Sequence, residues 1–112
     1  MTKFLFLYHA PMTPAEATPP TQEQMEAVMA EWTAWAARVG SGLVDFGTPL
    51  DGGVRVAADG STSPSTREVA GYSLIEAADM AAALELAKGH PHLSMPGGCE
   101  IEVHESLPVP GM

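Results

Sequence analysis

The sequence has little positive charge. Its 112 residues include 5 Lys and Arg against 14 Asp and Glu, which gives a formal net charge of −9 at pH 7. A surface of this sign repels nucleic-acid phosphates and anionic lipid head groups, so no binding to nucleic acid or to a membrane is expected. The apolar segments at residues 4–8 and 81–87 are far too short to cross a bilayer, and no signal-peptide pattern opens the chain. The sequence therefore predicts a cytoplasmic protein.

Cysteine is nearly absent, and so are the common catalytic motifs. Cys99 is the single cysteine, which excludes an internal disulfide, and its acidic neighbours disfavour a reactive thiolate. The chain has no glycine-rich nucleotide loop followed by a helix and no Gly-x-Ser-x-Gly nucleophile elbow. His90 and His92 have the spacing of metal ligands, but zinc needs more ligands than this pair supplies. We therefore predict no metal site and no cofactor.

The composition is that of one globular domain. Hydrophobic residues make up 46% of the chain, which supports one modest core, so residues 1–112 are expected to form a single domain. The apolar periodicity and the turn residues predict strands at residues 3–9, 43–47, 68–76 and 99–105, helices at 21–39 and 80–87, a hairpin or exposed excursion around 54–56, and a polar loop at 61–66. This order predicts an α+β fold of the ferredoxin-like βαββαβ type with an inserted hairpin.

The first helix has clear boundaries in the sequence. Thr21 and Gln24 have the spacing of a capping box, in which each side chain binds a free backbone N–H group of the other residue. Gly40 follows the last apolar position and is expected to end the helix.

The first strand is apolar on both faces. Its alternation places one set of side chains on each side of the sheet: Phe4, Phe6 and Tyr8 on one face, and Leu5, Leu7 and His9 on the other. Two helices can cover only one face of such a sheet. The second face needs another cover, and the same face of a second copy supplies it, so the sequence predicts a homodimer packed sheet to sheet.

An ordered set of short motifs resembles the YCII-related family, also called YciI-like or DGPF-domain proteins. The resemblance covers nearly the whole chain and rests on these segments: Phe4-Leu5-Phe6-Leu7-Tyr8, Trp32-x-x-Trp35, Leu43-Val44-Asp45-x-Gly47-x-Pro49, Gly71-Tyr72-Ser73, Gly89-His90-Pro91-His92-Leu93, and Gly97-Gly98 followed by Ile101-Glu102-Val103-x-Glu105. The Asp-Gly-Pro-Phe signature of one branch is missing.

The resemblance implies a dimeric α/β barrel with a cavity beside the sheet of each subunit. It does not imply one activity. Some members of the family act on aromatic compounds with a His–Asp pair in elimination chemistry, and others occur beside or fused to sigma-factor-like proteins. Trp32 and Trp35 stand where some relatives have a histidine on the first helix.

His9, Asp45 and His92 are the candidate catalytic residues. His9 ends the first strand, and Asp45 lies in the second strand, where alternation predicts the face of Leu43. An imidazole and a carboxylate brought together form a plausible general base. Alternatively, His9 binds a backbone group and Asp45 caps a turn or faces water. His92 lies in the loop that leads to the last strand, where cavities of such folds open.

Trp32, Trp35 and Tyr72 are the candidate substrate-binding residues. Large aromatic side chains on an amphipathic helix more often form core than a ligand surface. Two tryptophans three positions apart cannot both lie deep in so small a core, so one of them can line a cavity.

Two functions are consistent with these residues. The first is a dimer that binds a hydrophobic or aromatic small molecule, with or without His/Asp acid–base chemistry. The second is a non-catalytic dimeric binding or regulatory module with a packed core. A cofactor-free oxygenase has the same fold, and the sequence does not separate it from the first.

Overall fold

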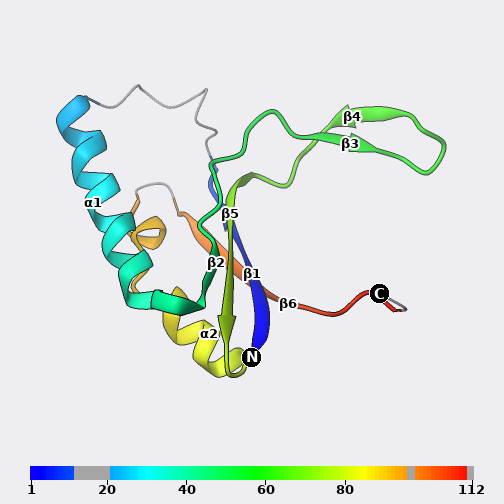
Figure 1. Ribbon diagram of the computed structural model, residues 1–112. Helices are drawn as coiled ribbons and strands as arrows, with labels where there is room; N and C mark the ends of the chain where they lie inside the picture. Colours follow the sequence, from blue (N-terminus) through cyan, green and yellow to red (C-terminus); the bar gives the residue numbers. More distant parts are fainter. Residues whose placement is uncertain (12–20, 96–97, 111–112) are drawn as a thin grey trace.

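The computed structural model describes residues 1–11, 21–95 and 98–110. This part of the chain is a mixed α+β structure with two α-helices and antiparallel sheets (Figure 1). In chain order the elements are β1 (Thr2–His9), α1 (Gln22–Val39), η1 (Gly40–Gly42), β2 (Leu43–Asp45), β3 (Val54–Val56), β4 (Thr62–Pro64), β5 (Val69–Ala77), α2 (Met80–Ala87), η2 (Pro91–Ser94) and β6 (Glu100–Ser106). Within the described ranges, no helix is long and apolar enough to cross a membrane.

Helix α1 begins and ends where the sequence predicts. The hydroxyl of Thr21 accepts a hydrogen bond from the backbone N–H of Gln24 at 3.1 Å, and the Gln24 side chain accepts one from the N–H of Thr21 at 2.9 Å. Both bonds satisfy N–H groups that have no partner inside the helix. Gly40 ends the helix with a φ of +67°, a backbone conformation that glycine adopts without steric cost.

The main sheet has the strand order β2-β5-β1-β6, and every neighbouring pair is antiparallel. The longest strands, β1 and β5, therefore lie at its centre. Strands β3 and β4 pair with each other as a separate two-stranded sheet. The order is compatible with the predicted ferredoxin-like arrangement, and the described strands of this single chain form no closed barrel.

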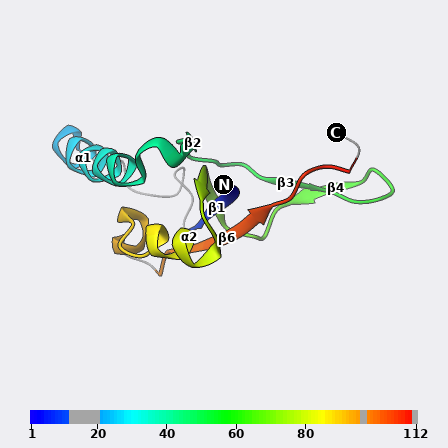
Figure 2. The ribbon, with the colours of Figure 1, turned by 60° about the horizontal axis from the view of Figure 1, so that its bottom comes forward.

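Both helices lie on one side of the main sheet (Figure 2). Phe4, Phe6 and Ile75 point to that side and are fully buried, and the indole of Trp35 packs against them. Each such side chain contributes about 1.5–3 kcal/mol by leaving water. The alternation predicted for the first strand is confirmed, because Leu5, Leu7 and His9 are only half-buried on the other side. We call that side the open face.

Two segments differ from the sequence-based prediction. Strand β2 ends at Asp45, and a register shift between Leu43 and Asp45 pairs these residues with Ile75 and Leu74. Consecutive partners on β5 point to opposite faces, so Asp45 lies on the open face and not on the face of Leu43. Residues 61–66, expected to be a loop, include strand β4, because the hairpin register is set by pairing with β3 and not by apolar alternation.

Candidate functional site

The predicted site residues fall on the two faces of the sheet. Trp32, Trp35 and His92 lie on the helix side with Tyr8. The side chains of His9, Asp45 and Tyr72 lie on the open face, because their positions alternate with the buried residues of the same strands. The predicted site residues therefore form two separate groups, one on each face of the sheet, and not one site.

His9 on the open face is held by the backbone. Its Nδ1 atom lies 3.0 Å from the carbonyl oxygen of Arg67. A carbonyl only accepts hydrogen bonds, so Nδ1 donates and carries the proton, and a neutral ring then has its lone pair on Nε2. Nε2 is buried and, among the described residues, has no hydrogen-bond partner, although it lies 3.1 Å from Oε2 of Glu102. A buried nitrogen of this kind calls for an explanation.

Glu102 is the carboxylate that the sequence analysis missed. The ladder between β1 and β6 pairs Leu7 with Glu102 and Leu5 with His104, so both β6 side chains share the open face with His9. Nε2 of His104 donates to Oε1 of Glu102 at 2.7 Å. This hydrogen bond is the main cause that lowers the pKa of the Glu102 carboxyl; partial burial opposes it, and electrostatic interactions with His9, His104 and Arg67 add to the lowering. The sequence did not predict which strand lies next to the first one, so it gave no signal for the pairing of His9 with Glu102.

Asp45 has different partners. The Tyr72 hydroxyl donates to Oδ2 of Asp45 at 3.2 Å, and the backbone N–H of Gly47 donates to Oδ1 at 2.9 Å. The hydrogen bond to the carboxylate and its negative charge raise the pKa of the Tyr72 phenol. Strand β5 separates β2 from β1, and Nε2 of His9 faces Glu102 on β6. His9 and Asp45 therefore do not form a pair within one chain. Asp45 instead caps a turn, which is the alternative role that the sequence allowed for it.

The helix side holds a chain of buried polar groups. The backbone N–H of His92 donates to Nδ1 of His90 at 3.0 Å, so Nδ1 is unprotonated and Nε2 carries the proton. His90 Nε2 then donates to the Tyr8 hydroxyl at 3.1 Å, Tyr8 donates to Oγ of Ser73 at 2.7 Å, and Ser73 donates to the carbonyl of Phe46 at 2.6 Å. Every hydroxyl and ring nitrogen in this chain thus has a partner. The spacing of His90 and His92 suggested only a metal pair, and no sequence pattern predicted a place for His90 in this chain of hydrogen bonds.

These groups are poor acids and bases near neutral pH. Burial lowers the pKa of His90 to about 3, and electrostatic interactions with His92 and Arg38 act in the same direction. Burial raises the pKa of Tyr8 to about 12, against a smaller opposing effect of the hydrogen bond to Ser73. The hydrogen-bonded chain therefore organises the core, and we assign it no proton transfer at pH 7.

Aromatic rings surround the imidazole of His90. The ring centres of Trp35, Trp32 and Tyr8 lie 4.4, 4.5 and 4.9 Å from it. Trp35 is 3% exposed and donates its indole N–H to the carbonyl of Leu86 at 2.8 Å, whereas Trp32 is half-buried. The prediction that the two tryptophans do not lie equally deep is confirmed, and Trp35 is a core residue.

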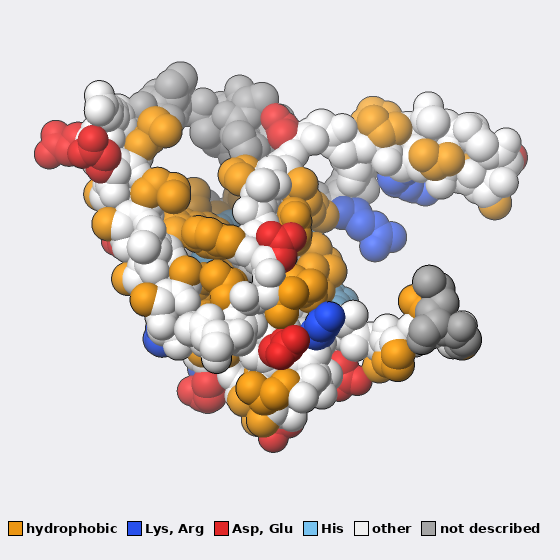
Figure 3. Space-filling view, in the orientation of Figure 1, with side chains coloured by type: hydrophobic (Ala, Val, Ile, Leu, Met, Phe, Trp, Pro, Cys, Tyr) orange, Lys and Arg blue, Asp and Glu red, His pale blue; other side chains and the backbone are white. Residues whose placement is uncertain are grey.

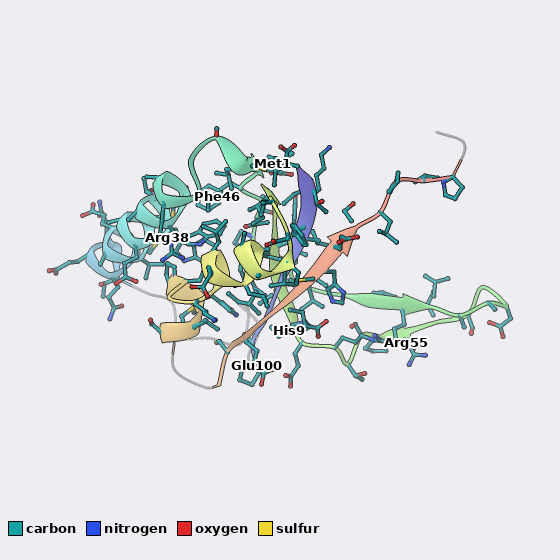
Figure 4. All side chains as sticks on the ribbon, turned by 90° about the horizontal axis from the view of Figure 1, so that it is seen from below. Met1, His9, Arg38, Phe46, Arg55 and Glu100 are labelled. Atoms are coloured by element: carbon teal, nitrogen blue, oxygen red, sulfur yellow. The ribbon has the colours of Figure 1, made fainter. Side chains whose placement is uncertain are left out.

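His92 links the two faces. Its side chain is buried, and its Nε2 donates at 2.9 Å to the backbone carbonyl of His9. The side chain of His9 itself reaches the open face near β6 (Figure 4). His92 therefore holds the backbone of His9 in place from the helix side, and its own side chain does not reach the open face.

Two surface cavities lie on the helix side. One, of about 370 Å³, lies between α1 and η2 and is lined by Glu31, Ala34, Trp35, Arg38, Gly89, Pro91 and Ser94. The other, of about 650 Å³, lies at the end of α1 and is lined by residues that include Met1, Val39, Glu76 and Leu86. The lining of neither includes His9, Asp45 or His92. Within the described ranges, no group of three or more His, Cys, Asp or Glu residues could hold a metal ion.

No protein-family model matches the chain, and no curated protein matches it.

Proposed function

We propose that the chain is a homodimeric small-molecule-binding protein of the YCII-related type, with a ferredoxin-like fold whose sheets pair into a dimeric α/β barrel. Its ligand is a hydrophobic or aromatic compound that binds on the open face, and His9 is the acid–base group of that site. The single observation that carries the proposal is the buried Nε2 of His9, which has no hydrogen-bond partner among the described residues.

The apolar character of the open face supports the dimer. Leu5 pairs with Leu74 and Leu7 pairs with Tyr72 across the two central strands, and all four side chains are half-buried in one chain. Both helices lie on the opposite side (Figure 2). Covering this face with the same face of a second copy removes apolar surface from water at about 25 cal/mol per Å².

The surroundings of His9 support acid–base chemistry. The carbonyl of Arg67 fixes the ring and its tautomer, which leaves the Nε2 lone pair to accept a proton. Glu102 lies 3.1 Å away and is the carboxylate that stabilises the imidazolium once it forms. The side chain of Glu102 is 54% exposed, so it can swing aside for a ligand. The acid–base pair is thus His9 with Glu102, and not His9 with Asp45.

A binding experiment with a matched pair of variants tests this site. In His9→Asn, the amide can still donate to the Arg67 carbonyl but offers no imidazole lone pair, and His104→Asn alters the same cluster without touching His9. Neutral aromatic fragments, such as phenols and benzamides, are titrated against each protein by NMR. We expect binding that shifts the signals of Tyr72 and of β1, weakened about tenfold by His9→Asn and little by His104→Asn. Fragments that shift only helix-side residues, or none, would contradict the proposal.

The non-catalytic dimeric module is the second candidate function. The hydrogen-bonded chain from His90 to Phe46 favours it, because that part of the core has every polar group paired and holds its aromatic rings in contact. If the wild-type protein is a dimer and His9→Asn leaves all fragment binding unchanged, this second function replaces the first.

A further inference from the structure

The hairpin of β3 and β4 has no support from the rest of the described chain. Its register pairs Val54 with Pro64, Arg55 with Ser63 and Val56 with Thr62, and neither strand joins the main sheet. All residues from 48 to 64 are exposed, and the valines Val54 and Val56 are 63% and 71% exposed. The hairpin therefore has no described core of its own and packs on no described core of this chain.

Such an element is not stable alone. An isolated two-stranded hairpin is marginally stable in water, and it needs a third strand, a helix or another surface to hold it. Exposed valines at alternate positions of β3 form an apolar stripe along one side of the hairpin. A surface outside this chain is the natural partner of that stripe.

The hairpin projects on the side of the open face. Figures 1, 2 and 4 all show β3 and β4 reaching away from the sheet on the side opposite to the two helices, and the segment after β6 reaches out on the same side. Figure 3 shows open space between these two projections. The radius of gyration is 15.6 Å, compared with about 13 Å for a compact domain of this length.

The charges of this side are complementary. Of the 5 Lys and Arg residues in the chain, Arg55 lies on β3 and Arg67 lies between β4 and β5. Strand β6 presents Glu100 and Glu102 on the open face, opposite His9 and Leu7 of β1, and both are exposed. Two of the five cations therefore lie on or beside the hairpin, which also carries Asp51 and Asp59, so the local attraction to an acidic strand comes from Arg55 and Arg67 and not from the net charge of the hairpin. A second copy of the chain offers this hairpin an acidic strand.

We propose that the β3–β4 hairpin is a dimerisation arm that reaches across the open face to a second copy of this chain. Val54 and Val56 pack on the partner protomer, and Arg55, whose side chain alternates with theirs, lies at the edge of this contact beside the acidic residues of the partner's last strand. In a two-fold dimer each contact is made twice. The arm also covers the His9 site from outside the sheet. This inference rests on the proposed homodimer and adds the element that holds it together.

The hairpin can be removed without breaking the chain around it. The backbone N–H of Ser65 donates to the carbonyl of Gly53 at 2.9 Å, so the two ends of the arm already lie side by side. Replacing residues 54–64 with Asn-Gly closes them with a two-residue hairpin turn. A second variant, Arg55→Glu, changes one exposed side chain and leaves the backbone intact. Its matched control is Lys88→Glu on the helix side, which makes the same change in net charge.

Sedimentation equilibrium measures the dimer dissociation constant of all four proteins, and near-UV circular dichroism of the tryptophans checks the fold. We expect the arm deletion to weaken the dimer at least about a hundredfold, Arg55→Glu to weaken it about tenfold, and Lys88→Glu to change it little. A wild-type dimer with unchanged dissociation constants in the deletion and in Arg55→Glu would overturn the arm alone. A monomeric wild-type protein would overturn the arm together with the proposed dimer.

Discussion

The hydroxyl of Tyr8 lies 3.1 Å from Nε2 of His90, and both side chains are buried between the sheet and the helices. Because the N–H of His92 occupies Nδ1 of His90, the ring donates to Tyr8 through Nε2 in its neutral form. Protonation of Nδ1 would break the bond from His92 and place a charge among aromatic rings. The core therefore depends on His90 remaining neutral.

This dependence predicts a loss of stability in acid. The pKa of His90 falls from 6.5 in the unfolded chain to about 3 in the folded protein. The unfolded chain takes up a proton that the folded protein excludes, so stability falls as the pH drops from about 6.5 towards about 3, at up to about 1.4 kcal/mol per pH unit. Urea unfolding across this range measures it, with His90→Asn as the reference without the imidazole. If the two stability curves run parallel, His90 does not titrate as described.

Removing the Tyr8 hydroxyl should destabilise the protein at neutral pH. Tyr8→Phe leaves the Nε2–H of His90 buried without an acceptor, which costs about 1–3 kcal/mol of unfolding free energy. Tyr72→Phe is the matched control, because its hydroxyl bonds to Asp45 on the exposed side of the sheet. The control is expected to change stability by about 0.5 kcal/mol or less. Equal losses of unfolding free energy in the two variants would show that the buried hydrogen bonds of Tyr8 stabilise the protein no more than the exposed one of Tyr72.

Gly47 is required by the turn that positions Asp45. It has a φ of +79°, and a Cβ atom at this position would collide with the backbone oxygen of Tyr72. Gly47→Ala is expected to cost about 3 kcal/mol or more, because the strand β5 backbone must move. Gly52→Ala is the control: Gly52 also has a positive φ, of +66°, but a Cβ there meets nothing within 4 Å, so only the left-handed backbone costs about 1 kcal/mol. Thermal or urea unfolding of both variants gives the comparison, and equal costs would contradict the collision.

Much of the fold can be predicted from the sequence where local signals agree. The capping box at Thr21, the glycine end at Gly40 and the two-faced first strand are all observed. Each depends on residues close together in the chain. The register shift after Leu43 and the pairing of β4 depend on hydrogen bonds between distant strands, which periodicity does not encode.

The candidate site was harder to predict for the same reason. His9 and the faces of β1 follow from alternation, but the carboxylate beside His9 depends on which strand lies next to it. Glu102 is 93 positions away in sequence, and it is brought to His9 only by the antiparallel ladder of β1 and β6. Alternation predicts Asp45 on the face of Leu43, but the register shift in β2 places it on the open face, where it binds Tyr72.

The central claim, a dimer that buries the open face around His9, is tested most directly by sedimentation equilibrium of the wild-type protein and of Leu7→Lys. Leu7 lies at the centre of the open face and is only half-buried in one chain, so lysine is tolerated in a monomer but places a charge inside the proposed interface. We predict a wild-type mass of twice 11.7 kDa, and a folded Leu7→Lys protein whose dimer is at least about a hundredfold weaker. A wild-type protein that sediments at 11.7 kDa at all concentrations, or a Leu7→Lys dimer as tight as the wild-type one, would contradict the account.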